Sequence, residues 1–139
     1  MPPCPASDRF HCRVPRTMAG LNRLGSWIDH VSAALRLAAG AEYALRLCLE
    51  EAVANVVMHG GPCSAAERVT ISLHADSSVL HITVEDACAP FDPTSWHEAQ
   101  VGLDQPGGRG LRLMRQYASS VSYRRTDDAN QLALTIGRS

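Results

Sequence analysis

The sequence lacks the long apolar runs that mark membrane and secreted proteins. No segment approaches the roughly 18 consecutive apolar residues that a membrane-spanning helix needs. The first residues, MPPCPASDRFHCR, lack the apolar core of a secretory signal peptide. The formal net charge of -1 leaves no basic excess for binding the phosphate backbone of a nucleic acid. We therefore expect a cytoplasmic protein that binds neither a membrane nor a nucleic acid directly.

Cysteine and histidine are present without the spacings that hold metals. The five cysteines are odd in number and include no Cys-x-x-Cys pair: Cys4, Cys12, Cys48, Cys63 and Cys88. This pattern predicts neither a disulfide framework nor a zinc site, and free thiols are expected instead. The six histidines include no His-Glu-x-x-His spacing, so a dedicated metal cage is not expected either.

What the chain does contain is typical of one globular domain. Its 139 residues are 45% hydrophobic and 19% charged, which is enough to bury a real core. We expect a flexible N-terminus over residues 1–9 and one folded domain over residues 10–139. Residues 87–110 show no strong period, and a loop of that length is usually a functional lid or disordered.

Hydrophobic periodicity predicts the order of helices and strands in this domain. Apolar residues recur at helical spacing over 17–37 and 42–59, with Gly40 ending the first helix, and again after residue 111. Alternation of apolar and polar residues predicts an edge strand at 10–14. It also predicts two antiparallel hairpins, one formed by strands 69–73 and 80–84 and the other by strands 121–125 and 132–136. The fold class is therefore α+β: a two-layer sandwich with helices on one face of a mostly antiparallel mixed sheet.

The predicted second helix, which includes LCLEEAVANVVMHG, places polar side chains among apolar ones. Glu51, Asn55 and His59 recur every four residues, so they share a face that is separate from the apolar stripe. A carboxylate in apolar surroundings is costly unless something pairs with it, which predicts a cavity with a polar guest. An amide oxygen beside a carboxylate suits hydrated magnesium and general-base chemistry. The alternative is that Glu51 and Asn55 merely widen the solvent-exposed face.

A second polar residue in an apolar setting ends the predicted strand in LHITVEDACAPFDP. By parity, Asp86 falls on the same side as the inward residues of that strand, Leu80, Ile82 and Val84. A buried aspartate must accept hydrogen bonds, and it reads a donor such as an exocyclic amine well. The alternative is that Asp86 caps the turn and faces solvent.

A glycine-rich stretch, PGGRGLRLM, precedes the predicted third helix. Gly107, Gly108 and Gly110 let backbone N–H groups approach an anion, next to the partial positive charge of a helix N-terminus. No Gly-Lys-Ser/Thr follows and no strand precedes, so the stretch is neither a Walker A loop nor a Rossmann fingerprint. A flexible connector is the alternative, and Arg109 either reaches a phosphate or points to solvent.

Taken together and in this order, these residues resemble the Bergerat-fold ATPases, the superfamily of DNA gyrase, the large heat-shock chaperone and the sensor histidine kinases. The resemblance runs from about Phe10 to the C-terminus. The Pro-Phe-Asp-Pro ending and the short length are similar to the anti-sigma-factor serine kinases of bacterial partner-switching systems. The matching segments are Glu51-Ala52-x-x-Asn55-x-x-x-His59, Asp86 followed by Pro90-Phe91-Asp92-Pro93, and Gly108-x-Gly110-Leu111-x-Leu113-Met114.

The resemblance implies a role for each matched residue. Glu51 matches the general base toward the substrate hydroxyl, Asn55 the ligand of the magnesium that bridges the ATP phosphates, and Asp86 the partner of the adenine amino group. Gly108 and Gly110 match the hinge of an ATP lid, which is placed near 94–109. The remaining residues expected at the nucleotide are His59, Cys88, Arg109 and Leu111.

The resemblance also implies partners and an activity. Members are typically dimers that bind a sigma factor and phosphorylate a serine of an anti-anti-sigma protein with a STAS domain. One departure is that the family pattern Asp-x-Gly reads Asp86-Ala87-Cys88 here, so a side chain stands where the backbone passes the adenine. Two functions remain open: a Mg-ATP-dependent serine kinase that is also an anti-sigma factor, and a non-catalytic module whose partner binding depends on the nucleotide.

Overall fold

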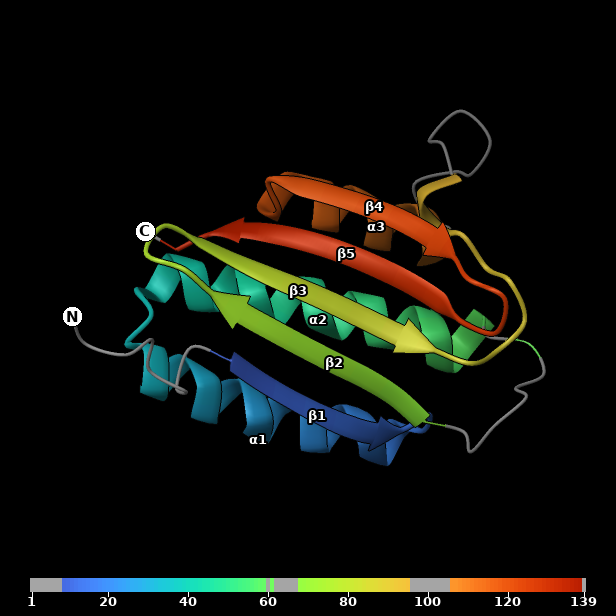
Figure 1. Ribbon diagram of the computed structural model, residues 1–139, viewed down its shortest axis with the longest axis horizontal. Helices are drawn as coiled ribbons and strands as arrows, with labels where there is room; N and C mark the ends of the chain where they lie inside the picture. Colours follow the sequence, from blue (N-terminus) through green and yellow to red (C-terminus); the bar gives the residue numbers. More distant parts are fainter. Residues whose placement is uncertain (1–8, 60, 62–67, 96–105, 139) are drawn as a thin grey trace.

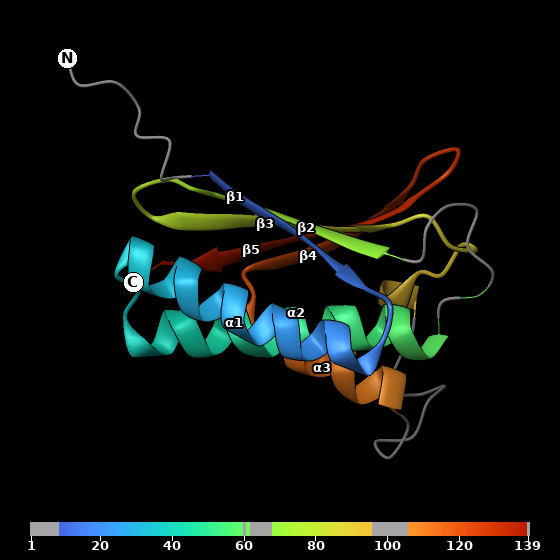
Figure 2. The same ribbon diagram turned by 90° about the horizontal axis from the view of Figure 1, so that it is seen from below.

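The computed structural model describes residues 9–59, 61, 68–95 and 106–138, which form two layers (Figure 1). One layer is a five-stranded sheet. The other consists of the helices, which all lie on the same face of that sheet (Figure 2). The strands are β1 (Arg9–Pro15), β2 (Arg68–Ala75), β3 (Val79–Asp86), β4 (Ser120–Arg125) and β5 (Asn130–Gly137). The helices are α1 (Met18–Leu35), α2 (Ala39–His59), the short 3-10 helix η2 (Pro93–Ser95) and α3 (Pro106–Tyr117).

The strand order in the sheet is β1-β2-β3-β5-β4, and the four described pairings are antiparallel. The expected two-layer α+β sandwich is thus confirmed, together with both hairpins and the position of the first strand at an edge. The outer face of the sheet carries no helix within the described residues. On that face Ser72, Thr83 and Ala133 stand in one row across three strands.

The core lies between the two layers and follows the periodicity of the sequence. The apolar stripe of α2 is buried against the sheet, as its helical spacing predicts. The inward residues of β2, β3 and β5 alternate with outward ones, as expected for strands with one covered face. The largest fully buried side chains come from α1, α2, β2, β3 and β5, and they include Leu24, Ile28, Leu45, Leu49, Ile71, Ile82 and Leu134.

Two element boundaries differ from the sequence prediction. Helix α1 ends at Leu35 because Arg36 takes the left-handed conformation (φ 53°, ψ 49°) and caps the helix with its own N–H group. Gly40 lies in the first turn of α2, so the expectation that Gly40 ends the first helix is wrong. Arg9 belongs to β1 and not to a flexible terminus, and residues 1–8 lie outside the described residues.

Gly20 marks the closest approach between α1 and the end of β1. A Cβ atom on Gly20 would lie 2.0 Å from the carbonyl oxygen of Pro15. Because that oxygen belongs to the backbone, the steric overlap can be removed only by a shift of β1 or α1. We therefore expect Gly20→Ala to lower the free energy of unfolding by about 1–3 kcal/mol. Urea unfolding measures the change. Gly25→Ala is the matched control in the same helix, because its Cβ would meet only a side-chain atom of Arg46, at 3.9 Å. Equal losses in the two variants would contradict this account.

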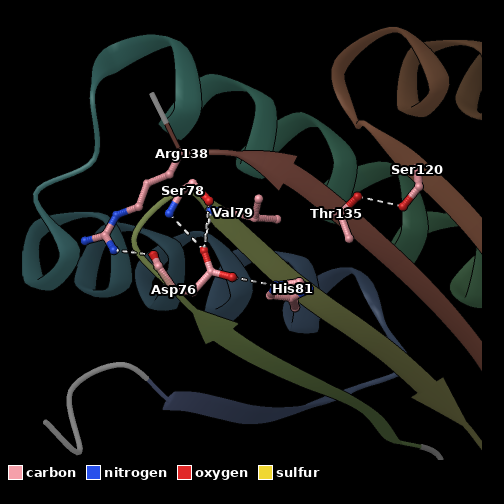
Figure 3. A network of polar contacts seen from close by, with 7 residues as sticks. All are labelled: Asp76, Ser78, Val79, His81, Ser120, Thr135 and Arg138. Atoms are coloured by element: carbon pink, nitrogen blue, oxygen red, sulfur yellow. Dashed lines mark hydrogen bonds and ion pairs between the residues drawn. The ribbon is translucent and has the colours of Figure 1, made fainter. Parts of the chain in front are cut away.

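The turn between β2 and β3 is closed by the carboxylate of Asp76 (Figure 3). Asp76 Oδ1 accepts the backbone N–H groups of Ser78 at 2.8 Å and Val79 at 2.7 Å. Its Oδ2 lies 3.1 Å from His81 Nε2. The Ser78 N–H group and then the His81 side chain hold the pKa of Asp76 below its ordinary value. These bonds fix the length of the hairpin loop and therefore the register of β3.

The same end of the sheet is tied to α1 through the last strand. The guanidinium of Arg138 donates to the carbonyl oxygens of Asp76, at 2.7 Å, and Leu35, at 3.1 Å. The Ser120 and Thr135 hydroxyls, 2.6 Å apart, join β4 to β5 (Figure 3).

Candidate functional site

A pocket lies between the C-terminal half of α2 and the sheet, at the end of β3 and the beginning of β5. Its empty space totals about 380 Å³, which includes open solvent at its mouth. Apolar side chains form most of its wall, and a few polar groups converge on it. The lining residues are Ala52, Asn55, Val56, Val84, Asp86, Phe91, Pro93, Tyr123, Asn130 and Leu132.

Asp86 ends β3 with its carboxylate directed into this pocket. The residue is only 7% exposed, so the alternative in which it faces solvent is wrong. Its Oδ1 accepts hydrogen bonds from Asn130 Nδ2 at 2.9 Å and from the Cys88 backbone N–H at 3.1 Å. The inward position follows from strand parity, because Asp86 continues the face of Val84 and Ile82. A buried carboxylate in a pocket is suited to reading a hydrogen-bond donor on a ligand.

Asn55 and Glu51 share the face of α2 that looks toward the start of α3. Asn55 lines the pocket at 7% exposure, and its Nδ2 is buried with no hydrogen-bond partner among the described residues. A Cβ atom on Gly110 would lie 2.8 Å from Glu51 Oε2 and 3.8 Å from Asn55 Oδ1. The spacing of four residues puts both side chains on one side of the helix. The expected clustering of Glu51, Asn55 and Gly110 is therefore present.

The carboxylate of Glu51 also influences the core beneath it. Burial raises the pKa of the Cys48 thiol to about 11, and the negative charge of Glu51 adds to this shift. Glu51 is half-buried and Asn55 is buried, so these two residues do not merely widen the solvent-exposed face.

The glycine-rich stretch is helical where the sequence predicted a loop. Residues 106–109, placed at the end of a lid over 94–109, form the start of α3, and residues 94 and 95 belong to η2. Proline is favoured in the first turn of a helix, which explains a start at Pro106 despite the glycines that follow. Residues 96–105 lie outside the described residues. Gly108 and Arg109 are in the first turn of α3, and Leu111 is buried in the core.

His59 supports the pocket wall from behind. Its ring stacks on that of Phe91, with centroids 5.4 Å apart and 15° between the planes. Phe91 lines the pocket and His59 does not. Of the three side chains in the motif Glu51-x-x-x-Asn55-x-x-x-His59, only that of Asn55 lines the pocket.

Cys88 corrects the expectation of free thiols. It is disulfide-bonded and 3% exposed, whereas Cys12 and Cys48 are free. Cys4 and Cys63 lie outside the described residues. A rule based on Cys-x-x-Cys spacing detects local pairs, and it misses a bond between cysteines that only the fold brings together. The side chain of Cys88 does not line the pocket, and its backbone reaches the site through the bond to Asp86.

Arg16 connects the end of α2 to the segment that follows β3 and contains Cys88. Its guanidinium donates to the carbonyl oxygens of Val56 at 3.0 Å and Gly61 at 2.9 Å, and it lies 3.9 Å from Cys88 Sγ.

Two further polar residues of the pocket, Asn130 and Tyr123, were missed by the sequence analysis. Asn130 stands opposite Asp86 in the register of β3 and β5, a pairing that the sequence analysis did not predict.

The residues present fit a magnesium ion bound mainly through phosphate oxygens and water. The amide of Asn55 is buried, faces the pocket and offers one oxygen ligand, which is the small protein share that magnesium requires. No group of three or more His, Cys, Asp or Glu side chains placed to hold a metal occurs within the described residues. None of the described helices is both long and apolar enough to cross a membrane.

Comparison with known sequences assigns this fold to a family. Residues 14–136 match the sequence family described as the histidine kinase-like ATPase domain, so the chain belongs to that family. It is also similar to the serine/threonine-protein kinase BtrW of Bordetella bronchiseptica, with 34% identity over 113 residues that cover 78% of this chain and 80% of BtrW. The resemblance to the anti-sigma-factor serine kinase type is thereby confirmed.

Solved structures support the same fold. The chain resembles the RsbU and RsbW domains of Rv1364c from Mycobacterium tuberculosis with a TM-score of 0.69 and 13% identity, over 94% of this chain and 33% of that one. It resembles the histidine kinase domain of the blue-light-activated histidine kinase from Erythrobacter litoralis EL346 with a TM-score of 0.52 and 19% identity, over 86% and 60%. The chain thus spans about a third of the first solved chain, and both likenesses concern the fold alone.

Proposed function

We propose that this protein is an anti-sigma factor and Mg-ATP-dependent serine kinase of a bacterial partner-switching system. In this proposal it binds a sigma factor, acts as a cytoplasmic homodimer, and phosphorylates a serine of an anti-anti-sigma protein with a STAS domain. The observation that carries the proposal is that Asn55 and Asp86 line one pocket, while Glu51 lies one helical turn before Asn55 and beside Gly110. The similarity to BtrW, which is named a serine/threonine-protein kinase, supports the choice of a protein substrate.

Each polar group has a separate task in this mechanism. Asp86 would accept a hydrogen bond from the adenine amino group. Asn55 holds the magnesium, which supplies charge neutralisation to the phosphates when bound. Glu51 would accept the proton of the attacking serine hydroxyl, and the close approach of Gly110 limits where its carboxylate can move. Phosphoryl transfer depends mostly on such positioning, so the geometry of these groups matters more than their number.

The test combines binding and transfer with the same purified chain. Calorimetric titration is expected to show binding of ATP in the presence of magnesium. Labelled ATP is then expected to transfer its terminal phosphate to a purified anti-anti-sigma protein with a STAS domain. The product should be acid-stable, as phosphoserine is and phosphohistidine is not. A chain that binds no ATP would refute the proposal as a whole.

A second function, the non-catalytic partner-binding module, is favoured by Cys88 at the place of the family glycine. The same experiment separates the two functions. Tight ATP binding with no transfer to the STAS-domain protein, but with nucleotide-dependent binding of that protein, would assign the chain to the second function.

Gly110→Ala tests whether the position of the Glu51 carboxylate matters for transfer. The added Cβ would stand 2.8 Å from Glu51 Oε2, which forces the carboxylate to move. Because small misplacements of a reacting group cost about 100-fold, we expect transfer to fall by about 10- to 100-fold. Thermal stability should not fall, since alanine is the better helix former. Gly40→Ala is the control, because its Cβ would have nothing within 4 Å. Normal transfer by Gly110→Ala would show that this approach is unimportant.

A further inference from the structure

Asn130 lines the pocket although none of the three motifs includes it. It is the first residue of β5, pairs with Asp86 of β3 and Arg125 of β4, and is 5% exposed. A buried amide has two donor hydrogens and two acceptor sites to satisfy. Where these four sites are used shows what the residue does for the pocket.

The amide of Asn130 is saturated by hydrogen bonds. Its Nδ2 donates to Asp86 Oδ1 at 2.9 Å and to the Ala89 carbonyl oxygen at 3.0 Å, with the Cys88 carbonyl oxygen at 3.4 Å. Its Oδ1 accepts from the Phe91 backbone N–H at 3.2 Å and from the Tyr123 hydroxyl at 2.6 Å. One side chain therefore joins the end of β3, the loop that follows it and β4.

The orientation of this amide is fixed by its backbone neighbours. A backbone N–H group can only donate a hydrogen bond, and a carbonyl oxygen can only accept one. If the side-chain amide of Asn130 were flipped, its NH2 group would face the Phe91 N–H and its oxygen would face the Ala89 carbonyl oxygen, so both hydrogen bonds would be lost. Burial raises the pKa of Tyr123 above its ordinary value, so its hydroxyl keeps its proton and remains a donor at neutral pH. Asn130 must then present a donor to Asp86.

The consequence falls on the two oxygens of Asp86. Oδ1 accepts from both Asn130 Nδ2 and the Cys88 N–H, while Oδ2 has no hydrogen bond within the described residues. The carboxylate is thus held in one rotation, with a single acceptor left for a ligand in the pocket. An acceptor held in this way favours a base with an amino group and disfavours one with a carbonyl oxygen at the same place.

From this network we infer that Asn130 is a positioning residue that sets the preference of the site for a 6-aminopurine over a 6-oxopurine. The inference rests on the proposed ATP site and adds the residue that determines base selectivity. Asn130 acts through Asp86 and through the wall formed by Phe91, and it does not take part in phosphoryl transfer itself.

The test measures the affinities of ATP and inosine triphosphate, which carries a carbonyl oxygen in place of the adenine amino group. Asn130→Asp keeps the shape but places an acceptor against Asp86 Oδ1. We expect it to weaken ATP binding by about 10- to 100-fold and to bring the ratio of the two affinities toward one. A merely structural role would weaken both nucleotides alike and leave the ratio unchanged, which would overturn the inference. Thermal unfolding shows whether the variant is folded.

Two more variants keep the inference open to refutation. Tyr123→Phe removes only the hydroxyl that donates to Asn130 Oδ1. We expect ATP affinity to fall by about 2- to 10-fold, and the ratio of ATP affinity to inosine triphosphate affinity to become smaller. If Asn130→Asp does not fold, unchanged affinity and ratio in Tyr123→Phe overturn the inference. Gln131→Ala is the control, since Gln131 is bonded to Glu85 on the outer face, and its ratio should equal that of the parent. A parent chain that binds neither nucleotide refutes the proposed function instead.

Discussion

Glu51→Gln is expected to reduce phosphoryl transfer by about 100- to 10,000-fold, the usual contribution of a general base. The variant keeps the shape and the packing against Gly110 but cannot accept the proton of the serine hydroxyl. ATP affinity should be nearly unchanged, because Glu51 is not among the residues that line the base pocket. Single-turnover transfer from labelled ATP to the STAS-domain protein measures the first quantity, and calorimetry measures the second.

Glu50→Gln is the matched control for this variant. Glu50 is the preceding residue of α2, on its exposed side, so it removes one carboxylate from the helix without touching the pocket. Its transfer rate should equal that of the parent. If Glu51→Gln transferred phosphate as fast as Glu50→Gln does, Glu51 would have no part in the mechanism.

Asp86→Asn is expected to weaken ATP binding by at least about 100-fold. The oxygen of the new amide can still accept from Asn130 and from the Cys88 N–H, so the internal network is preserved. The NH2 group of the new amide then takes the place of Asp86 Oδ2. Because the adenine amino group is also a donor, the hydrogen bond between them is lost. Loss of affinity without loss of thermal stability is therefore the specific signature, measured by calorimetry and by thermal unfolding.

The comparison for this variant is Glu85→Gln, one residue earlier in β3. Glu85 lies on the outer face, where it accepts a hydrogen bond from Gln131 at 2.6 Å. Because parity separates the two neighbours, only the change at Asp86 should alter nucleotide affinity. A similar loss in both variants would point to a general effect of strand charge and away from recognition of adenine.

Local periodicity was sufficient for most of the fold and for the motif residues. Asp86 was placed in the pocket by counting parity along one strand, and Glu51 and Asn55 were placed on one face by the turn of one helix. Both inferences use distances along the chain that secondary structure fixes almost completely. The sandwich followed because each predicted element had one apolar side to cover.

Features that depend on contacts between distant segments were predicted poorly. The hydrogen bonds of Asn130 join parts of the chain that only the folded sheet brings together. The disulfide of Cys88 follows no local spacing pattern. Helix ends were uncertain for a different reason: Arg36 accepts a left-handed conformation that favours glycine, while the glycines at the start of α3 are helical. Tertiary packing outweighs local propensity at such places.

The uncovered face of the sheet has a practical use. Ser72, Thr83 and Ala133 form a row on that face, and their neighbours along each strand point toward the core. A fluorophore or surface tether attached through any of the three would stand on the face of the sheet opposite the pocket. Immobilised or labelled protein could then report on ligand binding without a change to the residues that line the pocket.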